Sequence, residues 1–248
     1  MTVRESGGIQ SVQRALTILE LLSGSSIPMS VIEIGKKLDI NRNTVHSLIN
    51  TLMMEKYVVK DEVSGKYRVS EKLYALSCSY PSNLPVVRDS DTVMRDLSNR
   101  YHLELHFGIL SSSNEILIVN KYLPSSEQNT RSGFILPCHA SGLGKIILAF
   151  SPEEKRRELL EQCPFNKYTK NTITSKDKLL EELEEVRKNN YARDNGEYLD
   201  NTYCIAFPIF DSNSCLLATF SLSGSKEQLE KELKKIIPDA LQCSKSRV

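Results

Sequence analysis

Polar side chains with hydrogen-bonding ends recur at helical spacing along one side of residues 42–52. They are Arg42, Asn43, His46, Ser47 and Asn50. The other side carries an apolar stripe at positions i, i+3, i+4 and i+7, formed by Val45, Leu48, Ile49 and Leu52. Guanidinium, amide, imidazole and hydroxyl groups can hydrogen-bond base edges or phosphate oxygens. The segment therefore predicts a helix that is buried on one side and offers nucleic-acid-binding groups on the other.

A second candidate site is the small-residue segment A-S-G-L-G-K at 140–145. Small residues at the start of a helix leave backbone N–H groups open, and the helix dipole adds partial positive charge there. A small carboxylate suits such a position. The alternative is that Gly142 and Gly144 allow close packing of the helix against a sheet. The spacing G-x-x-x-x-G-K-[ST] of a nucleotide phosphate loop is absent.

Side chains that could support catalysis lack the required arrangement. Cys138 and His139 are neighbours in sequence, which alone does not make a nucleophile and its base. Cys204 lies in an apolar segment, where a free cysteine usually packs as a small hydrophobic residue. Ser221 and Ser223 lack the G-x-S-x-G pattern of a nucleophile elbow. We therefore predict that the chain is not an enzyme.

A metal site built from histidine and cysteine is a weaker alternative. Its candidate ligands are His102, His106, Cys138, His139 and Cys204. The first two are spaced i, i+4, but they fall where a predicted helix gives way to a strand, which would separate their side chains. We therefore expect no metal and no cofactor.

Two further helices and a hairpin would position the polar face at 42–52. Residues 9–22 predict a helix whose apolar set is Val12, Ala15, Leu16, Leu19 and Leu22. Residues 30–38 predict a second helix, in which Ser30 and Glu33 form a capping box and Ile32, Ile34 and Leu38 are apolar. Residues 57–60 and 66–69 alternate apolar and polar side chains around a turn containing Gly65.

This order of elements is typical of a helix-turn-helix followed by a wing. Lys66 and Arg68 lie on the predicted wing, where they would contact the phosphate backbone of DNA.

The remaining sequence predicts a second domain of mixed helices and strands. We expect a helix over 71–79 that stops at Pro81 and Pro85, and a helix over 86–101. Strands are expected over 103–111, 115–122, 131–136, 191–194, 203–210 and 216–223. Further helices are expected up to Phe150, from an N-cap at Ser151, over 176–190, and from Ser225 to about Gln242. The whole would be an α+β domain with a sheet of about six antiparallel strands.

Length and composition suit an ordinary globular protein. The chain has 248 residues, 40% hydrophobic and 25% charged, with a formal net charge of +1. No apolar run approaches the roughly 18–20 residues of a membrane helix, and the first residues lack the apolar core of a signal peptide. The six cysteines include no C-x-x-C pair, which favours reduced thiols in a cytoplasm. We expect a cytoplasmic protein with no membrane partner.

Several motifs together resemble the IclR family of bacterial transcriptional regulators. The N-terminal half carries S-V-Q-R-A-L-T-I-L-E-L-L, E-I-G-K-K-L and N-T-V-H-S-L-I-N-T-L. The C-terminal half carries P-C-H-A-S-G-L-G-K-I-I-L-A, C-I-A-F-P-I-F-D and F-S-L-S-G-S in the family's order. The resemblance spans roughly residues 9–225. It implies a winged helix-turn-helix domain at 9–70, a linker helix at 71–82 and a GAF-like effector-binding domain at 83–248.

The resemblance also implies roles for individual residues. The positions matching the family's effector pocket are Gly142, Leu143, Asp194, Cys204, Ser221 and Ser223. Backbone groups of the first two would hold an effector carboxylate, and Leu143 stands where a smaller residue is common in the family. On the DNA side, the expected contacts are Arg42, Asn43, Thr44, His46 and Ser47, with Lys66 and Arg68 on the wing.

We therefore expect a ligand-responsive transcriptional regulator with a mixed α/β architecture. Its partners would be a double-stranded DNA operator, a small organic acid and further copies of the chain, as a homodimer or tetramer. The competing reading is a small-molecule or metal-sensing module whose helix-turn-helix makes protein contacts instead.

Overall fold

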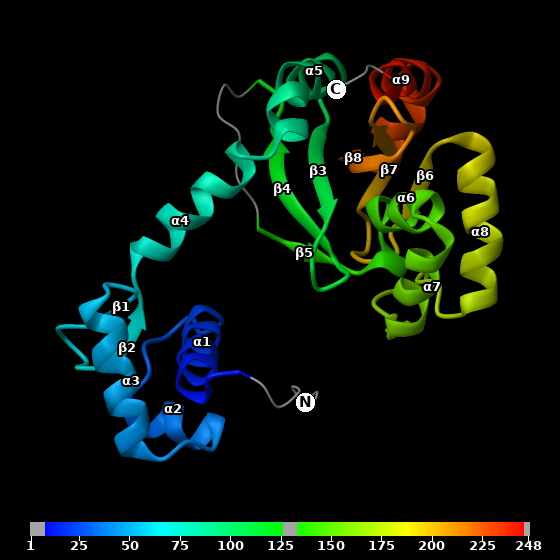
Figure 1. Ribbon diagram of the computed structural model, residues 1–248. Coiled ribbons are helices and arrows are strands. Elements are labelled where there is room, and N and C mark those ends of the chain that lie inside the picture. The colour runs from blue at the N-terminus through cyan, green and yellow to red at the C-terminus, as the bar shows by residue number, and fades with distance from the viewer. Residues whose placement is uncertain (1–7, 126–132, 246–248) are drawn as a thin grey trace. The chain divides into compact units, whose positions relative to one another are not determined.

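The computed structural model describes residues 8–125 and 133–245, and the chain divides into two compact units, Met1–Tyr80 and Pro81–Val248 (Figure 1). Each unit has a hydrophobic core of its own. The units are described separately below.

Three helices and a hairpin make the N-terminal unit. They are α1 (Gln10–Ser23), α2 (Val31–Leu38), α3 (Arg42–Met54), β1 (Val58–Lys60) and β2 (Tyr67–Val69). Ser30 and Glu33 form the predicted capping box at the start of α2. Asn41 caps α3 by accepting the N–H of Asn43 at 2.8 Å. Gly65 has a φ of +66° in the turn between the strands, as the hairpin requires. The predicted helix-turn-helix with a wing is confirmed.

The predicted apolar faces of α1 and α2 are partly wrong. Val12 and Leu16 were expected in the core but are about half exposed, at 52% and 51%, and Ile18 is buried in their place. In α2, Ile32 is 50% exposed while Ile34 is fully buried. Apolar residues lie on more than one side of each helix, so periodicity alone could not decide which side faces the core.

A helix predicted to stop before two prolines passes through the first of them. α4 spans Glu71–Ser82 and contains Pro81. Proline has a helical φ but lacks the N–H that would bond to the carbonyl four residues back, which weakens the helix, and α4 ends one residue later. Pro85 then occupies the first turn of α5 (Pro85–Tyr101), a position that favours proline.

The C-terminal unit is built on one antiparallel sheet. Within the described residues its six strands have the order β5-β4-β3-β8-β7-β6. Their bounds are β3 Glu104–Leu110, β4 Ile116–Tyr122, β5 Ile135–Leu136, β6 Ala192–Asn195, β7 Tyr203–Phe210 and β8 Leu216–Gly224. The prediction of a roughly six-stranded antiparallel sheet is confirmed, although the first two residues of the strand expected at 131–136 lie outside the described residues.

Helices cover both faces of this sheet (Figure 1). α5 and α9 (Lys226–Lys245) pack on one face around Phe107, Phe207 and Phe220. The other face is covered by α6 (Gly142–Phe150), α7 (Glu153–Gln162) and α8 (Lys176–Asn189). Ser225 and Gln228 cap α9 as predicted. Ser151 does not cap α7, because Pro152 is the N-cap and Ser151 ends α6 instead.

A β-bulge interrupts the pairing of β3 with β4. His106 pairs with Lys121, but Gly108 pairs with Ile118, so β4 contributes one extra residue between these two positions. Residues three apart on a regular strand point to opposite faces of the sheet. The bulge reverses that alternation, and Ile118 and Lys121 therefore share a face.

The start of α6 depends on close backbone packing at Gly144. A Cβ atom at this position would lie 2.3 Å from the carbonyl oxygen of Cys138 and 2.5 Å from its Cα. Both are backbone atoms, which cannot move aside as a flexible side chain can. Close packing against the sheet itself occurs at Gly142, where a Cβ would lie 3.2 Å from that of Ala206 on β7, while Gly144 packs on the backbone of Cys138.

We predict that Gly144→Ala lowers the free energy of unfolding of the C-terminal unit by about 1–3 kcal/mol, because overpacking forces the backbone apart. Denaturant unfolding of the full chain measures the change. Gly24→Ala is the control, since its Cβ would come no closer than 3.5 Å to the nearest atom tested. Equal effects of the two substitutions would contradict this account.

Candidate effector cavity and DNA-binding surface

A cavity of about 620 Å³ lies in the C-terminal unit between the sheet and the start of α6. All six residues predicted for the effector site line it: Gly142, Leu143, Asp194, Cys204, Ser221 and Ser223. A volume of this size is typical of a small-molecule site.

Strand register brings the polar wall residues together. Asp194 on β6 pairs with Cys204 on β7, which pairs with Ser223 on β8. Directly paired residues point to the same face of a sheet. Ser221 shares that face because it lies two residues from Ser223, and in the structure its partner on β7 is Ala206. Four residues from three strands thus form one wall.

The first turn of α6 forms the opposite wall. The side chain of Ser141 accepts the N–H of Gly144 at 3.1 Å. Within the described residues, the N–H groups of Gly142 and Leu143 have no acceptor, and both residues line the cavity. Two open N–H groups at the positive end of a helix dipole are suited to an anionic group.

Asp194 lies close to this helix start, since a Cβ on Gly142 would be 3.7 Å from that of Asp194. Its side chain is buried, and its Oδ1 accepts the N–H of Glu197 at 2.8 Å. Burial raises the pKa of Asp194 from 3.8 to about 6, and this bond opposes the rise. Asp194 therefore changes charge close to neutral pH, on the wall that faces Gly142.

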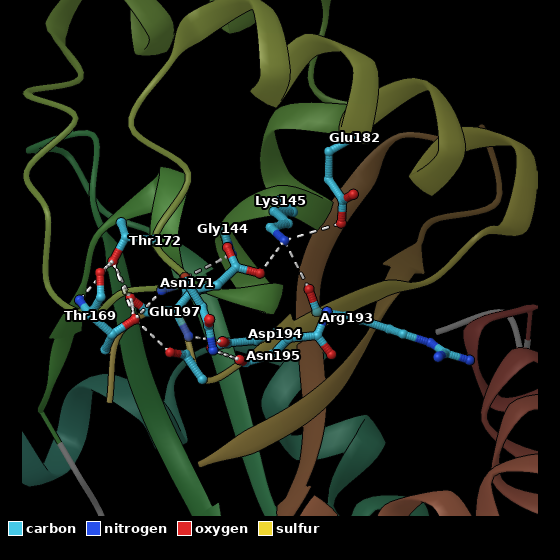
Figure 2. Close-up of polar contacts among 12 residues, drawn as sticks. Gly144, Lys145, Thr169, Asn171, Thr172, Glu182, Arg193, Asp194, Asn195 and Glu197 are labelled. Carbon is cyan, nitrogen blue, oxygen red and sulfur yellow. Dashed lines mark hydrogen bonds and ion pairs between the residues drawn. The ribbon is translucent and has the colours of Figure 1, made fainter. Parts of the chain in front are cut away.

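A buried lysine holds the segment after β6 in place (Figure 2). Lys145 on α6 is 1% exposed, and its Nζ donates to Glu197 Oε1 at 2.6 Å and to Glu182 Oε1 at 3.1 Å. It also donates to the carbonyl oxygen of Arg193 at 2.9 Å. Burial raises the pKa of Glu197, while the nearby Lys145 opposes that rise. The lysine thus ties both sides of Asp194 to α6.

Two threonines fix the backbone of the same segment. The Thr169 hydroxyl donates to the carbonyl oxygen of Gly196 at 2.7 Å, and the Thr172 hydroxyl donates to that of Glu197 at 2.7 Å (Figure 2). The segment that follows supplies further cavity walls, formed by Tyr198, Leu199, Asn201 and Thr202. This anchoring was not predicted from the sequence, because the threonines lie in an irregular segment with no recognisable pattern.

Sequence reasoning also missed three charged or ionisable wall residues on β3 and β4, which are Glu104, His106 and Lys121. Glu104 and His106 lie two residues apart on β3, so the alternation of side chains along that strand could have placed them on one face. The face of the sheet on which Lys121 lies could not be predicted, because it depends on the β-bulge.

Of the thiols and imidazoles considered for catalysis or metal binding, Cys204 and His106 line the cavity, whereas Cys138 and His139 are buried and do not line it. Burial raises the pKa of the Cys204 thiol to about 12, and that of Cys138 to about 12. His139 is buried, with Nε2 2.9 Å from the carbonyl oxygen of Asn166. Across residues 8–125 and 133–245, no three histidine, cysteine or acidic side chains are grouped to hold a metal.

The predicted DNA-contacting residues lie mainly on the outer side of α3. Arg42, Asn43, His46 and Ser47 are exposed, whereas Thr44 is half-buried. His46 Nδ1 lies 3.3 Å from Asn50 Nδ2, one turn further along. The opposite side of α3 is buried in the core of the N-terminal unit. The helix therefore presents a polar face whose groups can reach a groove of DNA.

The two wing residues differ in their surroundings. Arg68 is exposed on β2. Lys66 forms an ion pair with Glu33 at 3.0 Å, and a bond from the Ser30 N–H, together with Lys66, lowers the pKa of Glu33 to about 2. Such an exposed pair is weak, so it can exchange for a phosphate contact.

Comparisons with known proteins match both units. Residues 11–62 match the model of the IclR helix-turn-helix domain, and residues 78–246 match that of the C-terminal domain of bacterial IclR regulators. The chain is 30% identical over 216 residues to the HTH-type transcriptional regulator XynR of Escherichia coli K12, covering 87% of this chain and 86% of that protein. The chain belongs to the IclR family.

Solved structures agree with this assignment. Thermotoga maritima IclR has a TM-score of 0.71 at 25% identity, covering 94% of this chain and 97% of that one. An IclR homologue from Microbacterium hydrocarbonoxydans, solved with 4-hydroxybenzoate, has a TM-score of 0.77 at 20% identity, covering 95% and 96%. This IclR regulator thus has a helix-turn-helix DNA-binding domain and a C-terminal effector-binding domain, and its family is not one of enzymes. None of the helices in the described residues is long and apolar enough to cross a membrane.

We predict that Asp194→Asn stabilises the chain in a pH-dependent way. The folded state keeps the Asp194 proton up to about pH 6, whereas the unfolded chain releases it near pH 3.8, so this group's contribution to stability falls as the pH rises between these values. The free energy of unfolding of the variant should equal that of the unsubstituted chain near pH 4 and exceed it by about 1–3 kcal/mol above pH 6. Denaturant unfolding across this range measures the difference.

Asp200→Asn is the control, because Asp200 is exposed in the same segment. If the free energies of unfolding of Asp194→Asn and the unsubstituted chain differ by the same amount from pH 4 to pH 7, the prediction is contradicted.

Proposed function

We propose that this regulator is a cytoplasmic homo-oligomer whose binding to a DNA operator is controlled by a small carboxylate in the C-terminal cavity. Residues 9–70 would bind DNA and residues 83–248 would bind the effector. Residues 71–82 would form the helix that links these two domains. The observation that carries the proposal is the pair of N–H groups of Gly142 and Leu143, which have no acceptor within the described residues and belong to residues that line the cavity. A carboxylate can accept from both and gain from the helix dipole.

For DNA recognition, α3 would enter a major groove and the wing would contact the backbone. Asn43 and His46 offer groups for base edges, and Arg42 for a base or a phosphate. Lys66 and Arg68 would contact phosphates. Effector binding is allosteric only if its affinity differs between the arrangements that bind DNA and those that do not.

Pairing of subunits is supported by exposed apolar side chains. On α1 these are Ile9, just before the helix, Val12 and Leu16, and on α4 they are Tyr74, Leu76 and Tyr80. Exposed apolar groups at helical spacing favour burial against another chain. A symmetric dimer would present two copies of α3 to two half-sites. Sedimentation velocity of the full chain distinguishes a monomer from a dimer or tetramer.

We predict that Arg42→Ala weakens binding to the DNA upstream of the gene by about 1–3 kcal/mol. Fluorescence anisotropy at fixed salt measures the affinity, since phosphate contacts depend on salt. Arg88→Ala in the other unit is the control, because Arg88 is also an exposed arginine. The DNA-contacting role of α3 fails if Arg42→Ala and the unsubstituted chain bind equally well.

We predict that Gly142→Pro abolishes stabilisation of the chain by carboxylates. Proline removes the N–H but is favoured at the first position of a helix, and Ser141 before it has the extended backbone that proline requires. Gly142→Ala is the matched control, because it adds a Cβ and keeps the N–H. Thermal unfolding with gluconate, hexanoate and benzoate should show at least one acid that stabilises the unsubstituted chain and Gly142→Ala only. Stabilisation of Gly142→Pro by the same acid would refute the assignment.

A further inference from the structure

We infer that Glu104, His106 and Lys121 form a second subsite that binds hydroxyl groups of the effector, which makes the effector a polyhydroxylated carboxylic acid. The inference rests on the proposed function, because it takes the carboxylate to be held at the start of α6. It adds the chemical nature of the other end of the ligand. The three residues are called the β3–β4 polar cluster below.

Strand register places the cluster on the wall that carries the serines. Glu104 pairs with Ser223, and His106 pairs with Ser221 on one side and with Lys121 on the other. All five residues line the cavity. Lys121 reaches this face only because of the bulge in β4. The cavity wall therefore runs from Asp194 on β6, across β7, β8 and β3, to Lys121 on β4.

The two ends of the cavity are far enough apart to hold the two ends of one molecule. A Cβ on Gly142 would lie 3.2 Å from that of Ala206, so the start of α6 lies over β7. β7 and β4 are three strand spacings apart, about 14 Å. The Lys121 side chain reaches across part of this distance. A hydroxylated chain the length of a hexose-derived acid would fill the remainder.

The cluster contains both hydrogen-bond donors and hydrogen-bond acceptors. Glu104 forms an ion pair with Lys121, and His106 Nε2 lies 3.0 Å from Glu104 Oε1. His106 Nδ1 lies 3.3 Å from Ser223 Oγ. The Glu104, His106 and Lys121 side chains stay 32%, 23% and 25% exposed, so their polar atoms are not fully enclosed by protein. A hydroxyl group both donates and accepts, and it can therefore bond to either kind of atom.

Other ligand ends fit this cluster poorly. A second carboxylate would face Glu104, whose pKa is lowered to about 2 by His106 and Lys121, so that both groups would be negative. An alkyl or aryl end would remove three polar side chains from water without replacing their hydrogen bonds, which is costly. The apolar wall around Ile118 and Leu136 can pack against the C–H groups of a hydroxylated chain.

The test compares six-carbon acids that carry hydroxyl groups along the chain with six-carbon acids that carry none. Isothermal titration of the full chain at pH 7.5 would use gluconate, galactonate and mannonate against hexanoate and adipate. At least one of the three hydroxylated acids should bind tenfold or more tightly than hexanoate and adipate. Equal or tighter binding of hexanoate or adipate overturns the inference while leaving the carboxylate proposal intact. If none of the five acids binds, both proposals fail.

Two variants assign the preference to the cluster. Lys121→Met keeps the stem and removes the ammonium group, and Glu104→Gln keeps the shape and removes the charge. Each should reduce the preference for the hydroxylated acid over hexanoate by about tenfold, with hexanoate affinity unchanged. Lys235→Met is the control, because Lys235 is an exposed lysine on α9 outside the cavity lining. If both variants fold, by circular dichroism, and retain the full preference, the cluster does not bind the hydroxyl groups.

If Lys121→Met fails to fold, Glu104→Gln alone decides the outcome, and His106→Gln replaces Lys121→Met as the second variant.

Discussion

The C-terminal cavity depends on one buried ion pair, between Lys145 and Glu197. An ammonium group that is 1% exposed is strongly unfavourable unless charged and polar partners surround it. Glu197 comes from the segment after β6, so satisfying the lysine forces that segment against α6. Asp194 lies between two contacts of the same ammonium group, one to Arg193 and one to Glu197. The position of the cavity's acidic wall relative to the helix start is therefore a consequence of charge burial.

The same helix start shows how a short sequence can serve packing and binding together. Gly144 lies against the backbone of Cys138, where no side chain fits. Gly142 and Leu143, two residues and one residue earlier, line the cavity, and within the described residues their N–H groups have no acceptor. The sequence offered packing and binding as alternatives for the glycines; the structure shows close packing at both Gly142 and Gly144, and effector binding by Gly142 and Leu143 is proposed. Close packing at Gly144 is what holds the open N–H groups still.

Much of the fold could be predicted from local patterns. The capping box at Ser30, the turn at Gly65 and the alternation along the strands all depend on neighbouring residues, and each is present in the structure. The errors arose where the outcome depends on distant parts of the chain. Periodicity showed apolar residues at Leu16 and Ile18 but could not show which one the core would cover.

The effector-site residues came from family resemblance, and the structure brings all six to one cavity. The buried network around Lys145 and the wall residues on β3 and β4 were missed, because both depend on pairing between segments far apart in sequence.

The bulge in β4 has a consequence for how the cavity can change over evolution. Elsewhere in a sheet, deleting one residue of a strand turns the residues that follow it to the other face. Here, deleting Val119 would remove the bulge and keep Lys121 opposite His106, because Ile118 and Lys121 would then lie two residues apart on one face. Small insertions and deletions are usually neutral only in surface loops. In this protein one deletion inside a strand would leave the cavity face of β4 unchanged.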